Sequence, residues 1–283
     1  MNFSDLYKDN ISDYSEWIEP DVAENINRAY YRGIAAHDSY DDSVKAIVIW
    51  ELKSLEEQND TESEIAWIYS ADSGSIDPLF HEYENRIVTD EVKRSFFEST
   101  ELDQPMVDAL EGCSFTISPV ESKCLRLMLK DFTDLPFAKK KLPDYVQNIG
   151  SLNRMEFCQG IMNLLCRNGV DPIEDLSYLP MDWFDPNVSC CIKTDGKVNS
   201  FLLIHKCASG ALMPVLFYAV GADYRQNLLE MMRYSIRTAA RQYPEDTPVL
   251  IRRRNKEITL LLSKLFPTKK GAPAFAGSRA EKG

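Results

Sequence analysis

Cysteine and histidine are the residue types in this sequence that could bind a transition metal or act as a nucleophile. The chain holds seven cysteines and three histidines: Cys190 and Cys191 are adjacent, whereas His37, His81 and His205 lie far apart. No two cysteines have the CxxC spacing that is typical of zinc sites. We therefore predict no metal site, and we expect free thiols that pack as small hydrophobes in a reducing compartment.

Charged side chains are distributed unevenly along the chain, whose formal net charge is −12. Residues 1–130 carry 28 acidic and 11 basic side chains, whereas residues 131–283 carry 16 and 21. An acidic half repels phosphate backbones, so we predict that the chain does not bind nucleic acid. The same charge attracts amines and other cations; the alternative is that it serves solubility alone.

The pattern of apolar residues predicts no membrane role. The longest apolar runs, such as Ala46–Trp50 and Ala211–Gly221, are too short to span a bilayer. The first residues lack the basic and then apolar pattern of a signal peptide. With a length of 283 residues, we expect a cytoplasmic protein of two domains.

The elements that must position any site alternate between helices and strands in the first half. Apolar residues at helical spacing predict a helix within Tyr14–Asp38, and β-branched residues predict buried strands over Val44–Leu52 and Glu64–Ser70. The further elements that we predict are a turn over Asp72–Ser75, a helix over Ile76–Lys93, a short strand over Ser95–Ser99, a short helix over Pro105–Leu110 and a strand over Leu125–Leu129.

A segment rich in proline and lysine, Asp131–Pro143, predicts a linker at about residues 131–147. After it, a similar order of elements returns. We predict a helix over Ser151–Cys166, strands over Ser189–Lys193 and Val198–Lys206 around the turn Asp195-Gly196, a strand over Leu212–Val220, a helix over Leu228–Tyr243, a strand over Thr247–Arg252, a helix over Glu257–Phe266 and a last strand over Pro273–Ser278. The repeat predicts two domains, residues 1–135 and 145–283.

This arrangement resembles the GNAT superfamily of acyl-CoA-dependent N-acetyltransferases, in the tandem two-domain form of bacterial members. In the first copy, the segments that carry the resemblance are Tyr30–Ala35, Lys45–Glu51 and Glu64–Tyr69 with the turn and helix that follow. In the second copy they are Leu212–Val220, Gly221–Asp223, the helix from Leu228, Val249–Ile251 and Asn255. The resemblance implies the fold class α/β, with two tandem GNAT-like mixed-sheet domains flanked by helices.

Acetyl-CoA is the co-substrate that this resemblance implies. In the family two parallel strands separate, and the pantetheine arm pairs with the exposed strand backbone in the gap. The pyrophosphate lies on free N–H groups at the N-terminus of the next helix, where the helix dipole favours an anion. The cofactor-binding residues that the resemblance implies are Ile68, Tyr69, Ser70, Ser73, Gly74, Ser75 and Ile76 in the first copy, and Arg225 and Asn255 in the second.

The resemblance also implies a carboxylate that removes a proton from the amine. Glu64 opens the cofactor strand and is the first candidate, and Glu51 on the preceding strand is the second; the alternative is that both are solvated strand-end carboxylates. Two features depart from the family. Leu262 and Asp108 stand where a proton-donating tyrosine is expected, and Asp72 brings a like charge to the phosphate loop.

Two functions remain open at this point. The first is an N-acetyltransferase that transfers an acetyl group from acetyl-CoA to a small-molecule amine. The second is a catalytically inactive GNAT-like protein that binds a ligand or a protein partner. For the cofactor we favour the first copy, near Ile68–Ile76. The oligomeric state stays open.

Overall fold

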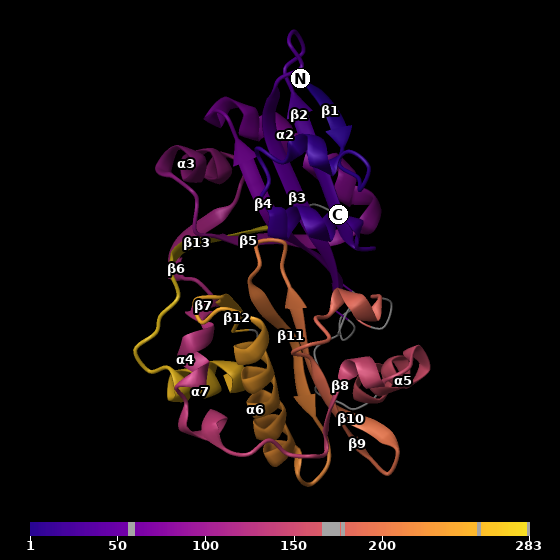
Figure 1. Ribbon diagram of the computed structural model, residues 1–283. Helices are drawn as coiled ribbons and strands as arrows, with labels where there is room; N and C mark the ends of the chain where they lie inside the picture. The colour runs from indigo at the N-terminus through magenta and orange to yellow at the C-terminus, as the bar shows by residue number, and fades with distance from the viewer. Residues whose placement is uncertain (56–59, 166–175, 177–178, 254–255, 282–283) are drawn as a thin grey trace. The chain divides into compact units, whose positions relative to one another are not determined.

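The computed structural model describes residues 1–55, 60–165, 176, 179–253 and 256–281 (Figure 1). The chain divides into two compact units: the first unit comprises residues 1–122 and 270–283, and the second unit comprises residues 123–269. Each unit has a mixed sheet of its own, to which helices are added. Within the described ranges, no helix is long and apolar enough to cross a membrane.

The first unit is built on a seven-stranded sheet in the order β1-β2-β3-β4-β5-β13-β6. Its strands are β1 (Asn2–Asp5), β2 (Tyr31–His37), β3 (Val44–Leu55), β4 (Asp60–Ser70), β5 (Val92–Ser99), β13 (Pro273–Ala280) and β6 (Thr116–Glu121). Strands β4 and β5 are parallel, and all the other neighbours are antiparallel. Among the strands that the structure describes in this sheet, β4 and β5 are therefore the one parallel pair.

Helices α2 (Ile76–Ile87) and α3 (Gln104–Gly112) belong to the core on one face of this sheet. The buried stripe of α2, which includes Leu79 and Tyr83, packs with Trp50 of β3. On the opposite face, Ile47 and Ile49 are buried under the N-terminal segment that contains α1 (Pro20–Ala23). The alternation of these β3 residues between the faces follows from the period of two in a strand.

The second unit is built on a six-stranded sheet in the order β7-β12-β11-β10-β9-β8. Its strands are β7 (Cys124–Met128), β12 (Pro248–Arg252), β11 (Leu212–Ala219), β10 (Lys197–Lys206), β9 (Cys190–Thr194) and β8 (Val146–Asn148). Its helices are α4 (Leu129–Thr133), α5 (Arg154–Leu165), α6 (Tyr224–Gln242) and α7 (Lys256–Leu265). Strands β11 and β12 are its parallel pair.

Separate apolar cores cover the two faces of the second sheet. One core joins β10, β11 and β12 to α4, α6 and α7, and the other joins β10 and β11 to α5. Figure 1 shows α6 running beside β11 and α5 beside β10. Asp195 and Gly196 form the predicted turn between β9 and β10, with φ values of 53° and 75° as a two-residue hairpin turn requires.

The division of the chain differs from the predicted boundary at about residues 131–147. That segment lies inside the second unit, where it includes α4 and a 3₁₀ turn at Pro136–Lys139. Strand β7, which we expected to end the first domain, pairs with β12 of the second unit. Strand β13, which we expected to end the second domain, lies between β5 and β6 of the first unit. In each sheet, one strand of the parallel pair therefore has a neighbour from the other half of the sequence: β13 lies beside β5, and β7 lies beside β12.

The helix predicted within Tyr14–Asp38 is wrong over most of its length. The structure has α1, a 3₁₀ turn at Glu24–Asn27 and then strand β2. Strand β2 pairs with β1 on one side and with β3 on the other, and this tertiary pairing overrides the helical spacing of its apolar residues. Strands β1, β6 and β8 were not predicted, because β1 and β8 are short and β6 contains Pro119.

Candidate functional site

The parallel strands of the first unit separate at a β-bulge. Strand β4 pairs with β5 from Thr61 to Ile65, which lies opposite Phe97, and then continues to Ser70 without β5 beside it. The register between β3 and β4 shifts at this point, so that Ala66 is an extra, exposed residue of β4. A bulge leaves its extra residue out of the ladder. A backbone N–H therefore becomes available where the gap begins.

The second unit repeats this arrangement with a wider gap. Between β10 and β11 the register shifts so that Val215 is the extra residue, and it corresponds to Ala66. Strand β11 pairs with β12 at Leu212 alone, opposite Val249. Pro214 stands where the first unit has Ile65, and a proline has no N–H with which to continue a ladder. The second gap therefore opens two residues earlier than the first.

The two predicted bases, Glu64 and Glu51, lie directly opposite each other on β4 and β3. Lys53 forms an ion pair with Glu64 and lies 3.7 Å from Glu51, and the Arg28 guanidinium lies 3.9 Å from Glu51. The Tyr31 hydroxyl also donates a hydrogen bond to Glu51. The structure brings both carboxylates beside the gap, where cationic side chains neutralise them.

The predicted phosphate loop of the first unit forms a 3₁₀ turn, Ser73–Ser75, ahead of α2. The Ser75 hydroxyl donates to the Asp72 carboxylate at 3.0 Å, and a Cβ on Gly74 would lie 3.3 Å from the same carboxylate. Asp72 therefore places a negative charge where the pyrophosphate was expected. Of the predicted cofactor strand, Ile68 packs toward α2, whereas Tyr69 faces the opposite core and Ser70 bonds to Asp72.

Helix α3 belongs to the core on the α2 side of the first unit. It packs against α2 and against the 3₁₀ turn, with Leu110 fully buried and Met106 half-buried against the same core as Ile68. Tyr83 is also fully buried, and its hydroxyl donates to Ser63 at 2.6 Å. Burial raises the pKa of the Tyr83 phenol well above its usual range, so this tyrosine is a neutral core residue.

The N-terminus of α6 in the second unit follows a glycine turn. Gly221 adopts a φ of 101°, which favours glycine, and Asp223 lies at the N-cap without forming a side-chain cap, as α2 also lacks one. The first N–H groups of an α-helix have no partner within the helix, so they remain available to an anion. Arg225 is exposed in this first turn, and its Nε donates to the Tyr224 hydroxyl at 2.9 Å. Asn255 lies outside the described residues.

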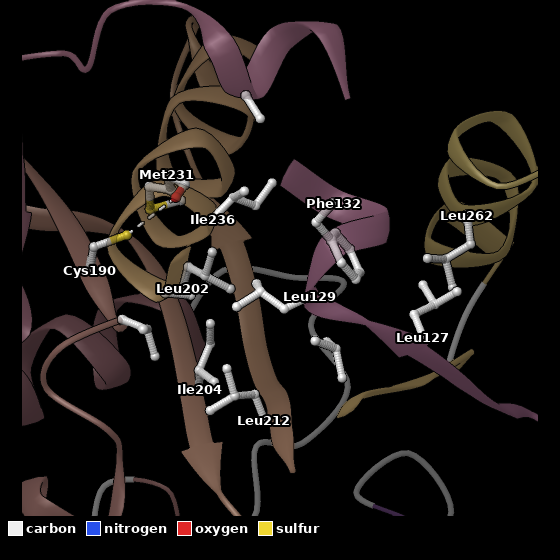
Figure 2. Close-up of a cluster of buried hydrophobic side chains, with 14 of the residues drawn as sticks. Leu127, Leu129, Phe132, Cys190, Leu202, Ile204, Leu212, Met231, Ile236 and Leu262 are labelled. Carbon is white, nitrogen blue, oxygen red and sulfur yellow. Dashed lines mark hydrogen bonds between the residues drawn. The ribbon is translucent and has the colours of Figure 1, made fainter. Parts of the chain in front are cut away.

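A cavity of about 130 Å³ lies in the core between β11, β12, α6 and α7 of the second unit. Its walls include Leu212 and Val249, the pair at which the strands meet, and Ile236 and Leu262 from the two helices. Figure 2 shows Ile236 near Leu202, with Ile204 and Leu212 further along the strands and Leu262 beside Leu127. The gap between the parallel strands is therefore backed by apolar space, which sequence reasoning did not foresee.

His205 is a site residue that sequence reasoning missed. It pairs with Met213 on β11, so it occupies the position that Glu51 has in the first unit. Its Nδ1 lies 2.8 Å from the Trp183 carbonyl oxygen, and its ring stacks on Trp183 at 3.8 Å. A carbonyl oxygen only accepts, so the Nδ1–H of His205 donates this hydrogen bond. The available signal was the position of His205 in the strand before the cofactor strand.

Comparisons with known proteins identify the fold. No protein-family model matches the sequence, and no curated protein matches it. A tandem GNAT protein from the clavulanic acid biosynthesis pathway superposes with a TM-score of 0.66 at 8% identity, covering 100% of this chain and 99% of that one. A conserved protein from Enterococcus faecalis V583, described as a probable N-acyltransferase, gives 0.52 at 10% identity, covering 99% and 72%.

A third solved structure is a GCN5-related glucosamine N-acetyltransferase region in a fungal multi-domain GH3 β-N-acetylglucosaminidase. Its TM-score is 0.60 at 11% identity, and the match covers 98% of this chain and 38% of that longer chain. The chain thus has a tandem GNAT fold, and the α/β fold class that the sequence predicted is confirmed. The likeness extends over both units.

Proposed function

We propose that this chain is an N-acyltransferase that moves an acyl group from acyl-CoA to a small amine, with the donor bound in the second unit. The observation that carries the proposal is the strand pair β11 and β12, which separates at a bulge in front of an apolar cavity. Exposed strand backbone in such a gap can pair with the amides of a pantetheine arm. An acyl-CoA supplies a thioester whose carbonyl carbon accepts an amine nitrogen.

Charge supports the choice of the second unit. It carries 21 basic and 15 acidic residues, whereas the first unit carries 11 and 29. A positive unit attracts the phosphates of a CoA ester, and an uncapped helix N-terminus gives them N–H donors. An aspartate precedes the equivalent helix in both units, Asp72 before α2 and Asp223 at the start of α6, so the helix termini do not distinguish them. The overall charge of the second unit therefore fits the donor better.

The proposed chemistry uses the two groups next to the gap. The Val215 bulge presents a backbone N–H that stabilises negative charge on the acyl oxygen while the amine attacks. His205, whose ring is positioned by the Trp183 carbonyl, is the group that we propose accepts the amine proton. The new bond joins nitrogen to the acyl carbon, the carbon–sulfur bond breaks, and the proton freed from the amine balances the departing thiolate.

The first unit contains the alternative base. Glu64 lies two residues before its bulge, and Glu51 lies opposite, in an acidic unit that attracts amines. An incoming ammonium group can replace Lys53 as the partner of this carboxylate pair. Glu64, with Glu51 opposite, is therefore the base that we propose if transfer takes place in the first unit.

Calorimetric titration with acetyl-CoA tests the donor. We expect one binding site per chain, and loss of that heat when Gly221→Val blocks the backbone before α6. No heat at high micromolar acetyl-CoA would contradict donor binding and would favour the inactive, ligand-binding alternative.

Replacement of the candidate bases tests the chemistry. In an assay of thiol release with a panel of amines, we expect His205→Asn to lower turnover 10²- to 10⁴-fold with unchanged donor affinity. Asparagine can still donate to the Trp183 carbonyl, so the geometry is retained. The matched variant Glu64→Gln is expected to leave turnover within about twofold. The reverse result would place the base in the first unit.

A further inference from the structure

We propose that the cavity of the second unit binds the hydrocarbon end of a medium-length acyl chain, so that the preferred donor carries about six carbons rather than two. This inference rests on the proposed function for the identity of the donor. The chemistry that it names, an acyl chain of this length, is shared by an acyl-CoA and a free carboxylic acid, and the experiment below distinguishes the two.

The walls of the cavity are almost wholly apolar. Aliphatic and aromatic side chains of β10, β11, β12, α4, α6 and α7 line it, and Ser235 and Arg252 are the polar side chains among them. The Ser235 hydroxyl donates to the Val188 carbonyl oxygen, so its donor is already satisfied. The Arg252 side chain is exposed, which places its charge at the solvent side. Such walls favour hydrocarbon over the amide-containing pantetheine arm.

The volume of the cavity sets the length of the chain. At about 130 Å³ it is close to the roughly 150 Å³ of an engineered apolar cavity that stays dry and binds benzene, a six-carbon ring. An acetyl group carries one methyl beyond the thioester carbonyl and leaves most of this space empty. A chain of about six carbons fills it, and a much longer chain exceeds it.

The position of the cavity fits the end of a donor that begins at α6. Ser235 lies eleven residues beyond Tyr224, which is about 16 Å along the helix axis. An extended pantetheine arm covers a distance of that order. Leu212 and Val249, where the strands meet, close the cavity at its inner end. A phosphate group at the N-terminus of α6 therefore directs the thioester toward the cavity.

Calorimetry with a series of CoA esters measures how the affinity depends on the length of the acyl chain. From acetyl-CoA to hexanoyl-CoA we expect the affinity to rise at least tenfold overall, since each buried methylene contributes up to roughly fourfold. From octanoyl-CoA to palmitoyl-CoA we expect no further gain. Equal affinities for all the esters would overturn the chain-length inference and leave the proposed function intact.

A pair of neighbouring alanines on α6 gives a matched control. Ala239 is buried and lines the cavity, whereas Ala240 is exposed on the same helix. Ala239→Leu is expected to reduce the affinity for hexanoyl-CoA to that for acetyl-CoA, and Ala240→Leu to change neither. If Ala239→Leu does not fold, Leu261→Phe fills the cavity from α7. A full hexanoyl preference in a folded, filled variant would overturn the proposal.

Sodium hexanoate separates this proposal from the proposed function. We expect hexanoate to raise the melting temperature of the wild-type protein and of Ala240→Leu, but not of Ala239→Leu. If hexanoate stabilises the protein in this pattern but no CoA ester binds, the cavity is a site for carboxylic acids and the proposed acyltransferase function is contradicted. Absence of both effects would overturn both proposals.

Discussion

The two units share the order of six strands, to which the first unit adds β6, but they differ at the gap between their parallel strands. In the first unit, pairing continues to Ile65, α3 packs against α2, and Asp72 lies at the helix N-terminus. In the second unit, pairing ends at Leu212, a cavity lies between α6 and α7, and Asp223 lies at the helix N-terminus. The second gap therefore begins earlier and is backed by an apolar cavity, whereas an acidic residue precedes the helix in both units.

Single residues account for much of this difference. Pro214 replaces Ile65 and removes a ladder donor, which widens the second gap. In the first unit, Leu110 of α3 is part of the core that includes α2, and Met106 packs against that core. Both units form the sheet although the parallel pairing ends at different positions. The topology alone therefore does not decide which copy binds a donor.

The largest expected effect concerns packing on the two sides of this comparison. Leu110→Ala removes a fully buried side chain of α3, and we expect it to lower the free energy of unfolding by about 3–5 kcal/mol. Leu262→Ala enlarges a space that already exists beside α7, and we expect a cost of about 2–3 kcal/mol. Urea unfolding measures both. Equal costs would mean that the second gap is as tightly packed as the first.

The second prediction concerns β13, which follows the second unit in the sequence but pairs with β5 and β6 of the first unit. A Cβ on Gly277 would overlap the ring of Phe97 on β5, so Gly277→Ala forces this part of the first unit to shift. We expect a loss of about 1–3 kcal/mol in thermal or urea unfolding. The control is Gly112→Ala at the end of α3, where no atom lies within 4 Å and a gain of about 0.5 kcal/mol is expected. Equal behaviour of the two variants would contradict the placement of β13.

The affinity for acetyl-CoA distinguishes the two units when one residue of each is replaced. Arg225→Ala removes an exposed guanidinium from the first turn of α6, and we expect the dissociation constant for acetyl-CoA to rise about fivefold, or about 1 kcal/mol. Gly74→Val alters only the turn before α2, and we expect no change in affinity. Calorimetry with both variants decides between the units, since the opposite pattern would place the donor in the first.

The smallest effect is a pH dependence at α4 of the second unit. Asp131 accepts from the Met128 N–H at 2.9 Å and pairs with Lys269 at 3.1 Å. Burial alone would raise the pKa of this carboxyl, but the hydrogen bond and the lysine outweigh it, so the pKa lies below its usual value. We therefore expect Asp131→Asn to cost about 1 kcal/mol at pH 7.

The sign of this effect follows from proton binding. Below the unfolded pKa of about 3.9, the unfolded chain takes up the proton first, so the stability due to Asp131 falls as the pH drops through the native pKa. Unfolding curves of the wild type and Asp131→Asn measured between pH 7 and pH 2.5 should therefore converge at the acid end. A constant difference would show that the carboxylate charge contributes nothing.

The sequence by itself determined the local elements whose pattern is strong. The apolar strands that include Val44–Leu52 and Glu64–Ser70, the Asp195-Gly196 turn and helix α6 were all predictable, because their periodicity and turn chemistry depend on near neighbours in the chain. The repeated order of such elements was enough to indicate the tandem fold. It also located Glu64 and Glu51 on adjacent strands, though not their pairing with Lys53.

Only the tertiary structure decided how those elements complete one another. The exchange of β7 and β13 joins residues more than a hundred positions apart, and no local pattern encodes such a pairing. The alignment of His205 with Glu51 depends on two strand registers, each set by a bulge. The cavity depends on how far α7 packs from α6. Register and packing depend on side chains that are distant in the sequence. For that reason the sequence located the strand pairs, whereas the tertiary structure determined which unit contains the cavity.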